Sequence, residues 1–289
     1  MEYILHIVIM ICIYAVLVLS ANLPVGMANL LTMCQAAFYG IGAYIGTFFL
    51  MQFDLPFILL AMLVMGFTGL FSLIVSYASV KLKNDYFILG TLGFQMIAYT
   101  ILYNWTDVTR GPYGIPGIPT IKLFGKVELS GIVGYCVLAI VVAAVSIWLF
   151  RMIKSSPFGR VLKAMRSDEL SVRALGRNTT LLKVQTFFIS AAFSGLAGLI
   201  YASYVSYIDP TSFTLDESIF IITALFIGGV GNVKGPVLGA VFVVILPELL
   251  RFVGLPDAAA ANLRQIIYGV ALVVVMFVRP QGILGENSK

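Results

Sequence analysis

The sequence predicts an all-α fold, a polytopic bundle of about nine to ten membrane-spanning helices, some of them broken, in a single transmembrane domain over residues 1–289. Hydrophobic residues make up 60% of the chain and charged residues only 11%, whereas soluble domains carry about 25% charged residues. The mean hydropathy is +1.01. Apolar runs of about 20 residues, long enough to cross a hydrocarbon core roughly 30 Å thick, recur along the whole chain.

The apolar runs place the spans at about 3–20, 27–50, 56–80, 86–103, 129–150, 184–204, 217–233, 235–253 and 263–279. The first is expected to be retained, because it lacks the basic residues and the cleavage site of a secretory signal. The second is the least regular, since Asn22, Pro24, Gly26, Asn29 and Gln35 interrupt it or its approach. One tilted span and two broken half-helices both fit this stretch.

Basic residues set the expected orientation. Segment 151–183 holds eight Lys and Arg residues against two acids, and such a loop stays in the cytoplasm. Nine spans then place the C-terminus in the cytoplasm and the N-terminus outside, and a tenth span near Asn22 would reverse only the N-terminal side. The turn with Lys81 and Lys83 is also expected inside.

Several function classes fit the sequence poorly. The net charge of +5 is concentrated in one loop, so it indicates topology and no nucleic-acid partner. Cys12, Cys34 and Cys136 have no metal-ligand spacing and are expected to be buried free thiols, and His6 is the only histidine, so we expect no metal, no catalytic residue and no enzyme. No GxxxxGK[ST] motif is present, so no nucleotide or other cofactor is expected on this chain.

Charged residues are nearly absent from the spans. Glu248 and Arg251 lie three residues apart near the end of one span, where they can neutralise each other. A carrier driven by protons or sodium normally needs an ionisable or coordinating group near the membrane midplane. The driving force is therefore expected to come from the solute gradient or from another protein.

Segment 151–183 is patterned as two short helices. Ser156 precedes Pro157 as a good N-cap of the first, and Ser167 can cap a second helix over about 168–175 that Gly176 would end. The expected apolar face of the first helix is Val161, Leu162 and Met165, and Leu170, Val172, Ala174 and Leu175 are available on the second. Patterning alone fits docking into a groove of a soluble partner as well as contact with anionic lipid.

A family resemblance distinguishes these two interpretations. The runs GRVLKAMR at 159–166, DEL at 168–170 and ALG at 174–176 resemble the cytoplasmic loop of LivM-like permeases, the membrane subunits of ABC importers for branched-chain amino acids. In that family the loop contacts the ATPase, as the EAA loop of other importers does, although the tripeptide Glu-Ala-Ala is missing here. The resemblance implies ATPase-coupling residues Arg160, Ser167, Asp168, Glu169, Leu170, Leu175 and Gly176.

Two further segments resemble the family pattern. One is the outer loop 104–119, whose Gly and Pro residues predict a defined, non-helical structure; its candidate residues are Trp105, Thr109, Gly111, Gly114, Gly117 and Pro119. It would face the binding protein or the substrate, or serve folding alone. The other comprises 196–198 and the glycine-rich run 228–240.

The expected translocation path uses small or uncharged polar residues, namely Asn29, Gln35, Gly40, Gly42, Gly228, Gly229 and Gly231. Helix packing is the competing role of membrane glycines. Residues 40–43 and 235–240 each begin an apolar run after an interrupted stretch, which hints at an internal duplication with paired broken helices.

The resemblance implies a fold of the ABC importer permease type and a subunit that moves branched-chain or related amino acids into the cytoplasm. Its implied partners are a second homologous permease in a heterodimer, two cytoplasmic ATPase subunits that hold ATP and Mg, an extracytoplasmic solute-binding protein and membrane lipid. The expected location is a bacterial or archaeal cytoplasmic (inner) membrane. The alternative is a self-sufficient channel or facilitator for a small polar solute such as urea or an amide.

Overall fold

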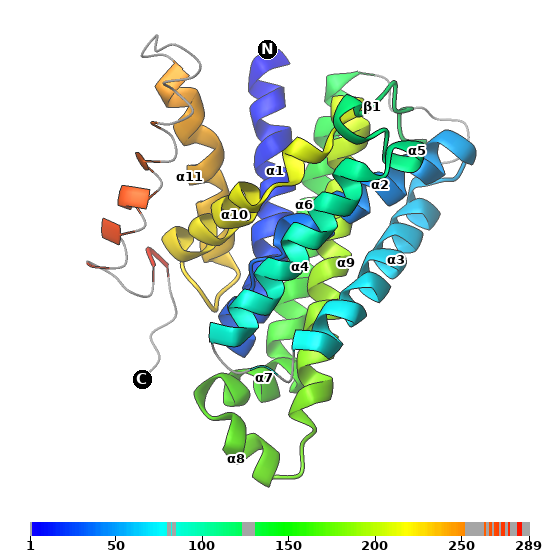
Figure 1. Cartoon of the computed structure of the whole chain (residues 1–289). Coiled ribbons are helices and arrows are strands. Elements are labelled where there is room, and N and C mark those ends of the chain that lie inside the picture. The colour runs from blue at the N-terminus through cyan, green and yellow to red at the C-terminus, as the bar shows by residue number, and fades with distance from the viewer. Residues whose placement is uncertain are drawn as a thin grey trace.

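The computed structural model describes residues 2–79, 82, 85–122, 131–251, 263, 266, 267, 269–271, 273, 274, 277 and 282–284. The long helices are α1 (Glu2–Asn22), α2 (Gln35–Gln52), α3 (Phe57–Ser79), α4 (Asp85–Asn104), α6 (Ile132–Ser155), α9 (Thr179–Val205), α10 (Leu215–Gly228) and α11 (Lys234–Arg251), arranged as a bundle in Figure 1. A π-helical turn, η1 (Leu23–Met27), extends α1. The described part of the chain is thus mostly helical, as predicted.

Five helices in the described ranges are long and apolar enough to cross a membrane: α1 with its extension, α3, α4, α6 and α9. Two predicted bounds were wrong. Helix α2 begins at Gln35 instead of residue 27, and α10 ends at Gly228 instead of residue 233, because an irregular stretch precedes α2 and follows α10. The predicted turn at Lys81 and Lys83, the side chain of Arg251 and eight of the 17 residues of the span 263–279 lie outside the described residues.

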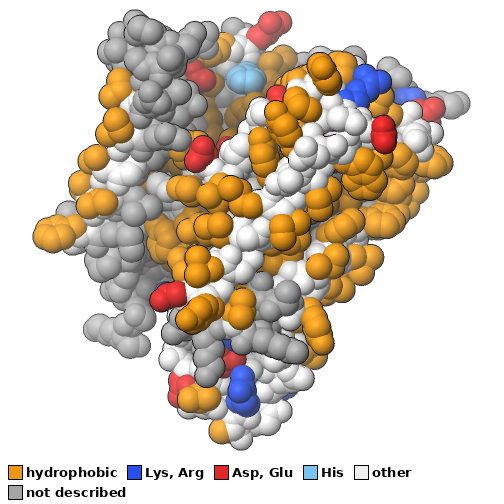
Figure 2. Space-filling model, viewed as in Figure 1, with side chains coloured by type: hydrophobic (Ala, Val, Ile, Leu, Met, Phe, Trp, Pro, Cys, Tyr) orange, Lys and Arg blue, Asp and Glu red, His pale blue; other side chains and the backbone are white. Residues whose placement is uncertain are grey.

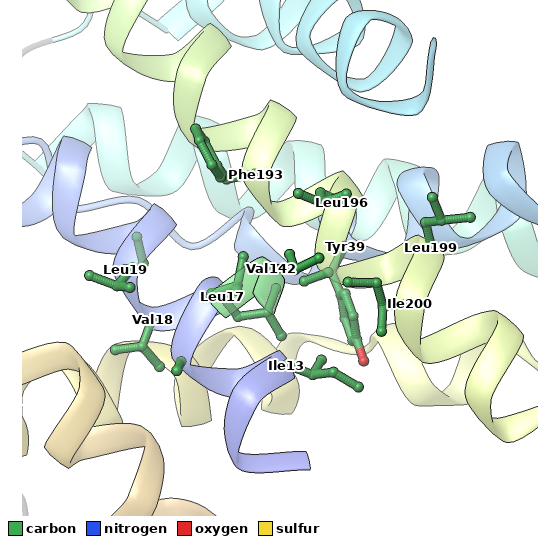
Figure 3. Packing of buried hydrophobic residues seen from close by; sticks show 14 of the residues in the cluster. Ile13, Leu17, Val18, Leu19, Tyr39, Val142, Phe193, Leu196, Leu199 and Ile200 are labelled. Atoms are coloured by element: carbon green, nitrogen blue, oxygen red, sulfur yellow. The ribbon is translucent and has the colours of Figure 1, made fainter. Parts of the chain in front are cut away.

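Helix α9 occupies the centre of the bundle and packs against α1, α2 and α3. Glycines permit this close approach: a Cβ at Gly42 would lie 2.1 Å from the Cα of Gly195, and a Cβ at Gly198 would lie 2.2 Å from the carbonyl oxygen of Tyr39. Figure 3 shows Leu17, Tyr39 and Leu196 among the side chains packed where α1, α2 and α9 meet. Small residues that bring helix backbones together are the usual basis of association in a bilayer.

The outer surface of the bundle is apolar, whereas charge lies mainly towards its two ends (Figure 2). Helix α3 illustrates this, because Met62, Ile74 and Tyr77 are 65%, 63% and 72% exposed. Such a face would be unfavourable in water and suits contact with lipid chains. The apolar helices therefore support a multi-pass membrane protein.

Short elements mark the two ends of the bundle. At one end, β1 (Ile115–Pro116) pairs antiparallel with β2 (Tyr207–Ile208), next to α5 (Thr106–Thr109), η2 (Gly111–Tyr113) and η3 (Pro210–Phe213). At the other end, α7 (Pro157–Ser167) and α8 (Glu169–Ala174) project from the bundle (Figure 1). Residues 156–178 are called the elbow below.

Candidate coupling and translocation site

Helix α1 is broken in its last turns. Pro24 and Gly26 lie in the π-helical turn η1, which Ala28 caps, and Asn29 follows with a positive φ of 55°, a conformation that asparagine tolerates better than most residues. The amide of Leu30 donates to the carbonyl of Pro24 over 2.9 Å. Residues 29–34 are non-helical, so the polar backbone of this stretch needs protein or water beside it.

A second break separates α10 from α11 and lies against the first. The amide of Gly231 donates to Asn22 Oδ1 over 3.0 Å, and Asn22 Nδ2 donates to the carbonyl of Asn232 over 2.7 Å. Asn232 Oδ1 in turn accepts from the amide of Gly235 over 2.6 Å at the start of α11. The buried side chain of Asn22 thus satisfies one backbone donor and one backbone acceptor of the second break. Residues 22–27 and 229–233 are called the junction below.

An arginine of the elbow reaches the junction. Arg166, near the end of α7, donates from Nη1 to the carbonyl of Gly26 over 2.8 Å. Gly231 lies so close that a Cβ there would be 2.8 Å from the same nitrogen. Helix α7 therefore contacts both broken segments through one guanidinium, which connects the elbow directly to the irregular backbone inside the bundle.

The start of α2 is capped by side chains from other helices, since Cys34 at its N-cap makes no side-chain cap. The amide of Ala36 donates to Ser218 Oγ over 2.9 Å, and that of Ala37 donates to Gln95 Oε1 over 2.7 Å. On this same first turn, Gln35 Nε2 donates to the hydroxyls of Ser20 and Ser194, each over 2.5 Å. Uncharged polar groups from α1, α4, α9 and α10 thus satisfy a helix end inside the bundle.

The predicted path residues separate into two groups. Gly40, Gly42 and Gly228 lie at close contacts: a Cβ at Gly40 would be 2.8 Å from the Phe213 ring, and one at Gly228 would be 2.0 Å from the carbonyl of Gly235. Gly229 and Gly231 have positive φ in the second break, and Asn29 lies at the first. The structure brings Gly231 to the junction, whereas Gln35 belongs to the buried serine cluster.

The elbow begins as predicted. Ser156 Oγ accepts from the amide of Gly159 and caps α7, with Pro157 in the first turn. Leu162 and Met165 are buried. Because these apolar side chains belong to the main hydrophobic core, α7 is packed against the end of the bundle from which the elbow projects.

The predicted cap of the second helix was wrong. Ser167 is the last residue of α7, and Asp168 caps α8 by accepting from the amide of Leu170 over 2.8 Å. Hydrogen bonds from the Ser171 hydroxyl and from the amides of Ser171 and Leu170 hold the pKa of Asp168 below its ordinary value. Gly176, at φ 78°, ends the helix as predicted, with its amide donating to Arg173 and that of Arg177 to Val172.

Glu169 fastens α8 to α9. Its carboxylate lies 2.7 Å from Lys183 Nζ on α9 and 3.2 Å from Arg173 Nη2 on its own helix. Burial alone raises the pKa of Glu169, but the hydrogen bond and charge of Lys183, a further hydrogen bond with Thr179 and the charge of Arg173 outweigh it and lower that pKa. Glu169 is thus engaged within the chain.

The elbow has an exposed apolar tip. Leu170 and Leu175 are 72% and 82% exposed, whereas Val172, which was expected to be available, is buried because it faces the bundle. Arg160 donates from Nη1 to the carbonyl of Ser155 over 3.1 Å and stays at the surface.

The predicted outer loop is defined but partly helical, so the expectation of a non-helical structure was wrong over α5 (Thr106–Thr109) and the 3-10 turn η2 (Gly111–Tyr113). Thr109 is buried, and its hydroxyl lies 2.7 Å from the carbonyls of Leu102 and Trp105. Gly111, Gly114 and Gly117 all have positive φ. The carbonyl of Pro119 accepts from the Ser203 hydroxyl over 3.2 Å. The ring of Trp105, in contrast, is 54% exposed.

Sequence reasoning missed three residues of this site. Asn22 was noted only as an interruption, Arg166 only as part of a motif and Asn232 only within the glycine-rich run. The available signal was an asparagine inside each broken stretch, because an amide can satisfy both a backbone donor and a backbone acceptor. No pattern in the sequence relates positions that lie 209 and 140 residues apart.

Comparison with known proteins identifies the family. Residues 3–276 match the family described as branched-chain amino acid transport system / permease component. The chain is 33% identical to the high-affinity branched-chain amino acid transport system permease protein LivM of Salmonella typhimurium, over 94% of this chain and 68% of that protein. LivM of Escherichia coli K12 is 32% identical with the same coverage.

A more distant relative is the autoinducer 2 import system permease protein LsrC of Salmonella paratyphi B, 27% identical over 82% of this chain and 66% of that protein. No solved structure matches the chain. The family match spans most of the bundle, both breaks and the elbow. The chain therefore belongs to the branched-chain amino acid transport permease family and is a permease subunit of an ABC importer.

Proposed function

We propose that this chain, as one transmembrane domain, imports branched-chain or related amino acids with energy supplied by two cytoplasmic ATPase subunits that hold ATP and Mg. A second homologous permease completes the pathway as a heterodimer, and an extracytoplasmic binding protein delivers the amino acid to the outer-loop end. The elbow, within segment 151–183, and the C-terminus lie in the cytoplasm of a bacterial or archaeal cell.

The elbow has the features of a docking element. Leu170 and Leu175 present an apolar tip that is largely exposed. Caps at both ends of α8 and the ion pair of Glu169 with Lys183 fix its orientation. A short, rigid helix with an apolar tip suits insertion into a groove of a soluble partner. Arg160 and Ser167, at the surface of the elbow, would contribute polar contacts.

The observation that carries the proposal is the bond from Arg166 to the Gly26 carbonyl. A displacement of the elbow by the ATPases must move this guanidinium. Because Asn22 connects η1 to the loop with Gly231, both breaks would then move together. We propose that this movement opens the pathway at the elbow end, past Asn29, Gly229 and Gly231.

The test is uptake in proteoliposomes. The chain is reconstituted with its partner permease and ATPases, with binding protein and radiolabelled leucine added. Leu170→Asp with Leu175→Asp should reduce ATP-driven uptake at least tenfold and release the ATPases, because a carboxylate would be desolvated in an apolar groove. The control Leu175→Met keeps size and apolarity and should retain uptake.

A second variant separates docking from transmission. Arg166→Gln should keep the ATPases bound and hydrolysing while uptake falls, since only the connection to the junction is lost. Unchanged uptake by both variants would contradict the proposal. Leucine flux through the chain alone, without any ATPase, would favour the channel or facilitator instead.

A further inference from the structure

A cavity lies between the elbow and the first break. It measures about 770 Å³ and is bounded by residues 28–31, the first turn of α4, the end of α7, α8 and the start of α9. Pockets that bind small molecules span roughly 300–1,000 Å³. The cavity therefore has room for a small metabolite at the point where the elbow meets the junction.

The lining combines apolar and charged residues, which are called its apolar and charged walls below. Leu31, Phe87, Ile88 and Met165 supply aliphatic and aromatic surface. The charged residues are Asp85, Arg166, Glu169, Arg173 and Lys183. A ligand that matches both walls has an apolar body and at least one charged head.

The charged side chains of the lining are not equally available to a ligand. Glu169 already pairs with Arg173 and Lys183, so these three largely neutralise one another. Arg166 uses Nη1 towards Gly26, whereas a guanidinium carries five N–H donors. Asp85, at the N-terminus of α4, has no hydrogen-bond or ion-pair partner among the described residues. Among the described residues, Arg166 and Asp85 thus remain to meet a ligand.

We infer that this cavity binds an aliphatic α-amino acid from the elbow side. The carboxylate of the ligand pairs with Arg166, the ammonium group pairs with Asp85, and the side chain lies against Leu31, Ile88 and Met165. One free cation beside two carboxylates disfavours a polyphosphate, and the apolar wall disfavours a strongly polar amino acid. This inference rests on the proposed function, because it takes the transported solute as the ligand.

Ligand binding in the cavity is coupled to displacement of the elbow. Arg166 would bind the ligand with the same guanidinium that holds the Gly26 carbonyl, and Met165 and Glu169 belong to α7 and α8. A ligand that bridges α4 and α7 opposes displacement of the elbow. The product amino acid would therefore slow its own import when it accumulates on that side.

The experiment measures binding without transport. The full chain is purified in nanodiscs, which expose both faces, and leucine is titrated calorimetrically. Leucine should bind, whereas leucine methyl ester, which lacks the carboxylate, and 4-methylpentanoate, which lacks the ammonium group, should each bind at least tenfold more weakly. Glutamate should not bind measurably.

Three variants locate the site. Arg166→Gln should weaken leucine binding at least tenfold, whereas the control Arg177→Gln, on the elbow but outside the cavity lining, should leave it unchanged. Since Arg166→Gln also removes the Gly26 contact, Asp85→Asn provides a second variant that spares the junction. It should weaken leucine binding and leave the binding of 4-methylpentanoate unchanged.

The inference is overturned if leucine fails to bind to the wild-type chain, or if Arg166→Gln and Asp85→Asn bind it as tightly as the wild type. Thermal melting of each variant confirms that it is folded. No ATPase is present in this assay, so failure of the importer proposal in proteoliposomes and failure of this site are separate results.

Discussion

At the outer-loop end, two loops from distant parts of the sequence are joined by backbone hydrogen bonds, whereas at the elbow end side chains make the connections. Ile115 pairs with Ile208, and the amide of Gly117 donates to the carbonyl of Ser206 over 3.0 Å. Across the elbow, Arg166 holds the Gly26 carbonyl and Glu169 holds Lys183.

This difference separates a fixed end from a movable one. Backbone pairing between loops with several positive-φ glycines leaves little freedom, because few conformations satisfy it. Side chains can release a partner and find another at modest cost, since each exposed ion pair contributes only about 0.2–1 kcal/mol. The elbow end is thus suited to respond to a partner, and the outer-loop end to hold its shape.

The largest effect is expected from a glycine in the outer loop. Gly114→Ala should destabilise the protein by about 2–5 kcal/mol, because φ is 66° and the new Cβ would lie 2.6 Å from the carbonyl oxygen of Ile208. Gly117→Ala, with a φ of 73° but no atom within 4 Å, should cost about 1–2 kcal/mol. Thermal or urea unfolding in detergent measures both, and equal losses would show that the close contact is unimportant.

A smaller effect is expected at the junction. Asn22→Ala removes the partners of the Gly231 amide and the Asn232 carbonyl and should cost about 1–3 kcal/mol, because at least one of these polar groups stays buried. Asn104→Ala is the control, since the one bond of that exposed amide among the described residues is to the carbonyl of Thr100. Its expected loss is below about 0.5 kcal/mol. If the two variants unfold alike, Asn22 does not join the two breaks.

The sequence predicted those features of the elbow end that depend on neighbouring residues, namely where helices begin and end. Ser156 before Pro157 predicted the start of α7, and Gly176 predicted the end of α8. The interruptions between Asn22 and Gln35 marked an irregular stretch, although one tilted span and two broken half-helices both fitted it. Each of these features depends on backbone preferences that act within a few residues, so the sequence is sufficient to predict it.

Contacts between residues far apart in the sequence could not be predicted from such local signals. The ion pair of Glu169 with Lys183 was not predicted, because it forms only where α8 folds back onto α9 and the two charges meet. The predicted second and seventh spans were too long and ran into the two breaks. Hydropathy is averaged over a window of residues, so it does not detect hydrogen bonds from another helix, such as those of Asn22. The role of Arg166 likewise depends on how the helices pack.

The next smaller effect tests the ion pair of the elbow. A double-mutant cycle with Glu169→Gln and Lys183→Met should give a coupling energy of about 0.2–1 kcal/mol, the range of partly exposed pairs. Hydrogen exchange of the α8 amides reports the same loosening locally. Glu169→Gln combined with Arg173→Gln is the matched cycle within α8, and its coupling should be smaller, because that pair is longer and more exposed. A coupling of zero for Glu169 and Lys183 would mean that α8 is held by Val172 and its caps alone.

The smallest effect near neutral pH is expected from titration of the elbow. The pKa values of Asp168 and Glu169 lie below their ordinary values of 3.8 and 4.5 in the folded protein. A depressed pKa stabilises the folded state above the ordinary value and loses that contribution as the pH falls through the folded value. Exchange protection of α8, corrected for the intrinsic rate, should therefore be constant from pH 8 to about pH 5 and fall only below about pH 4. The variant Asp168→Asn with Glu169→Gln should be loosened already at neutral pH and show no such fall. A change in the exchange protection of α8 in the wild-type protein between pH 7 and 5 would instead require another titrating group at the elbow. The elbow end would then differ from the outer-loop end in its pH response as well as in its use of side-chain instead of backbone contacts.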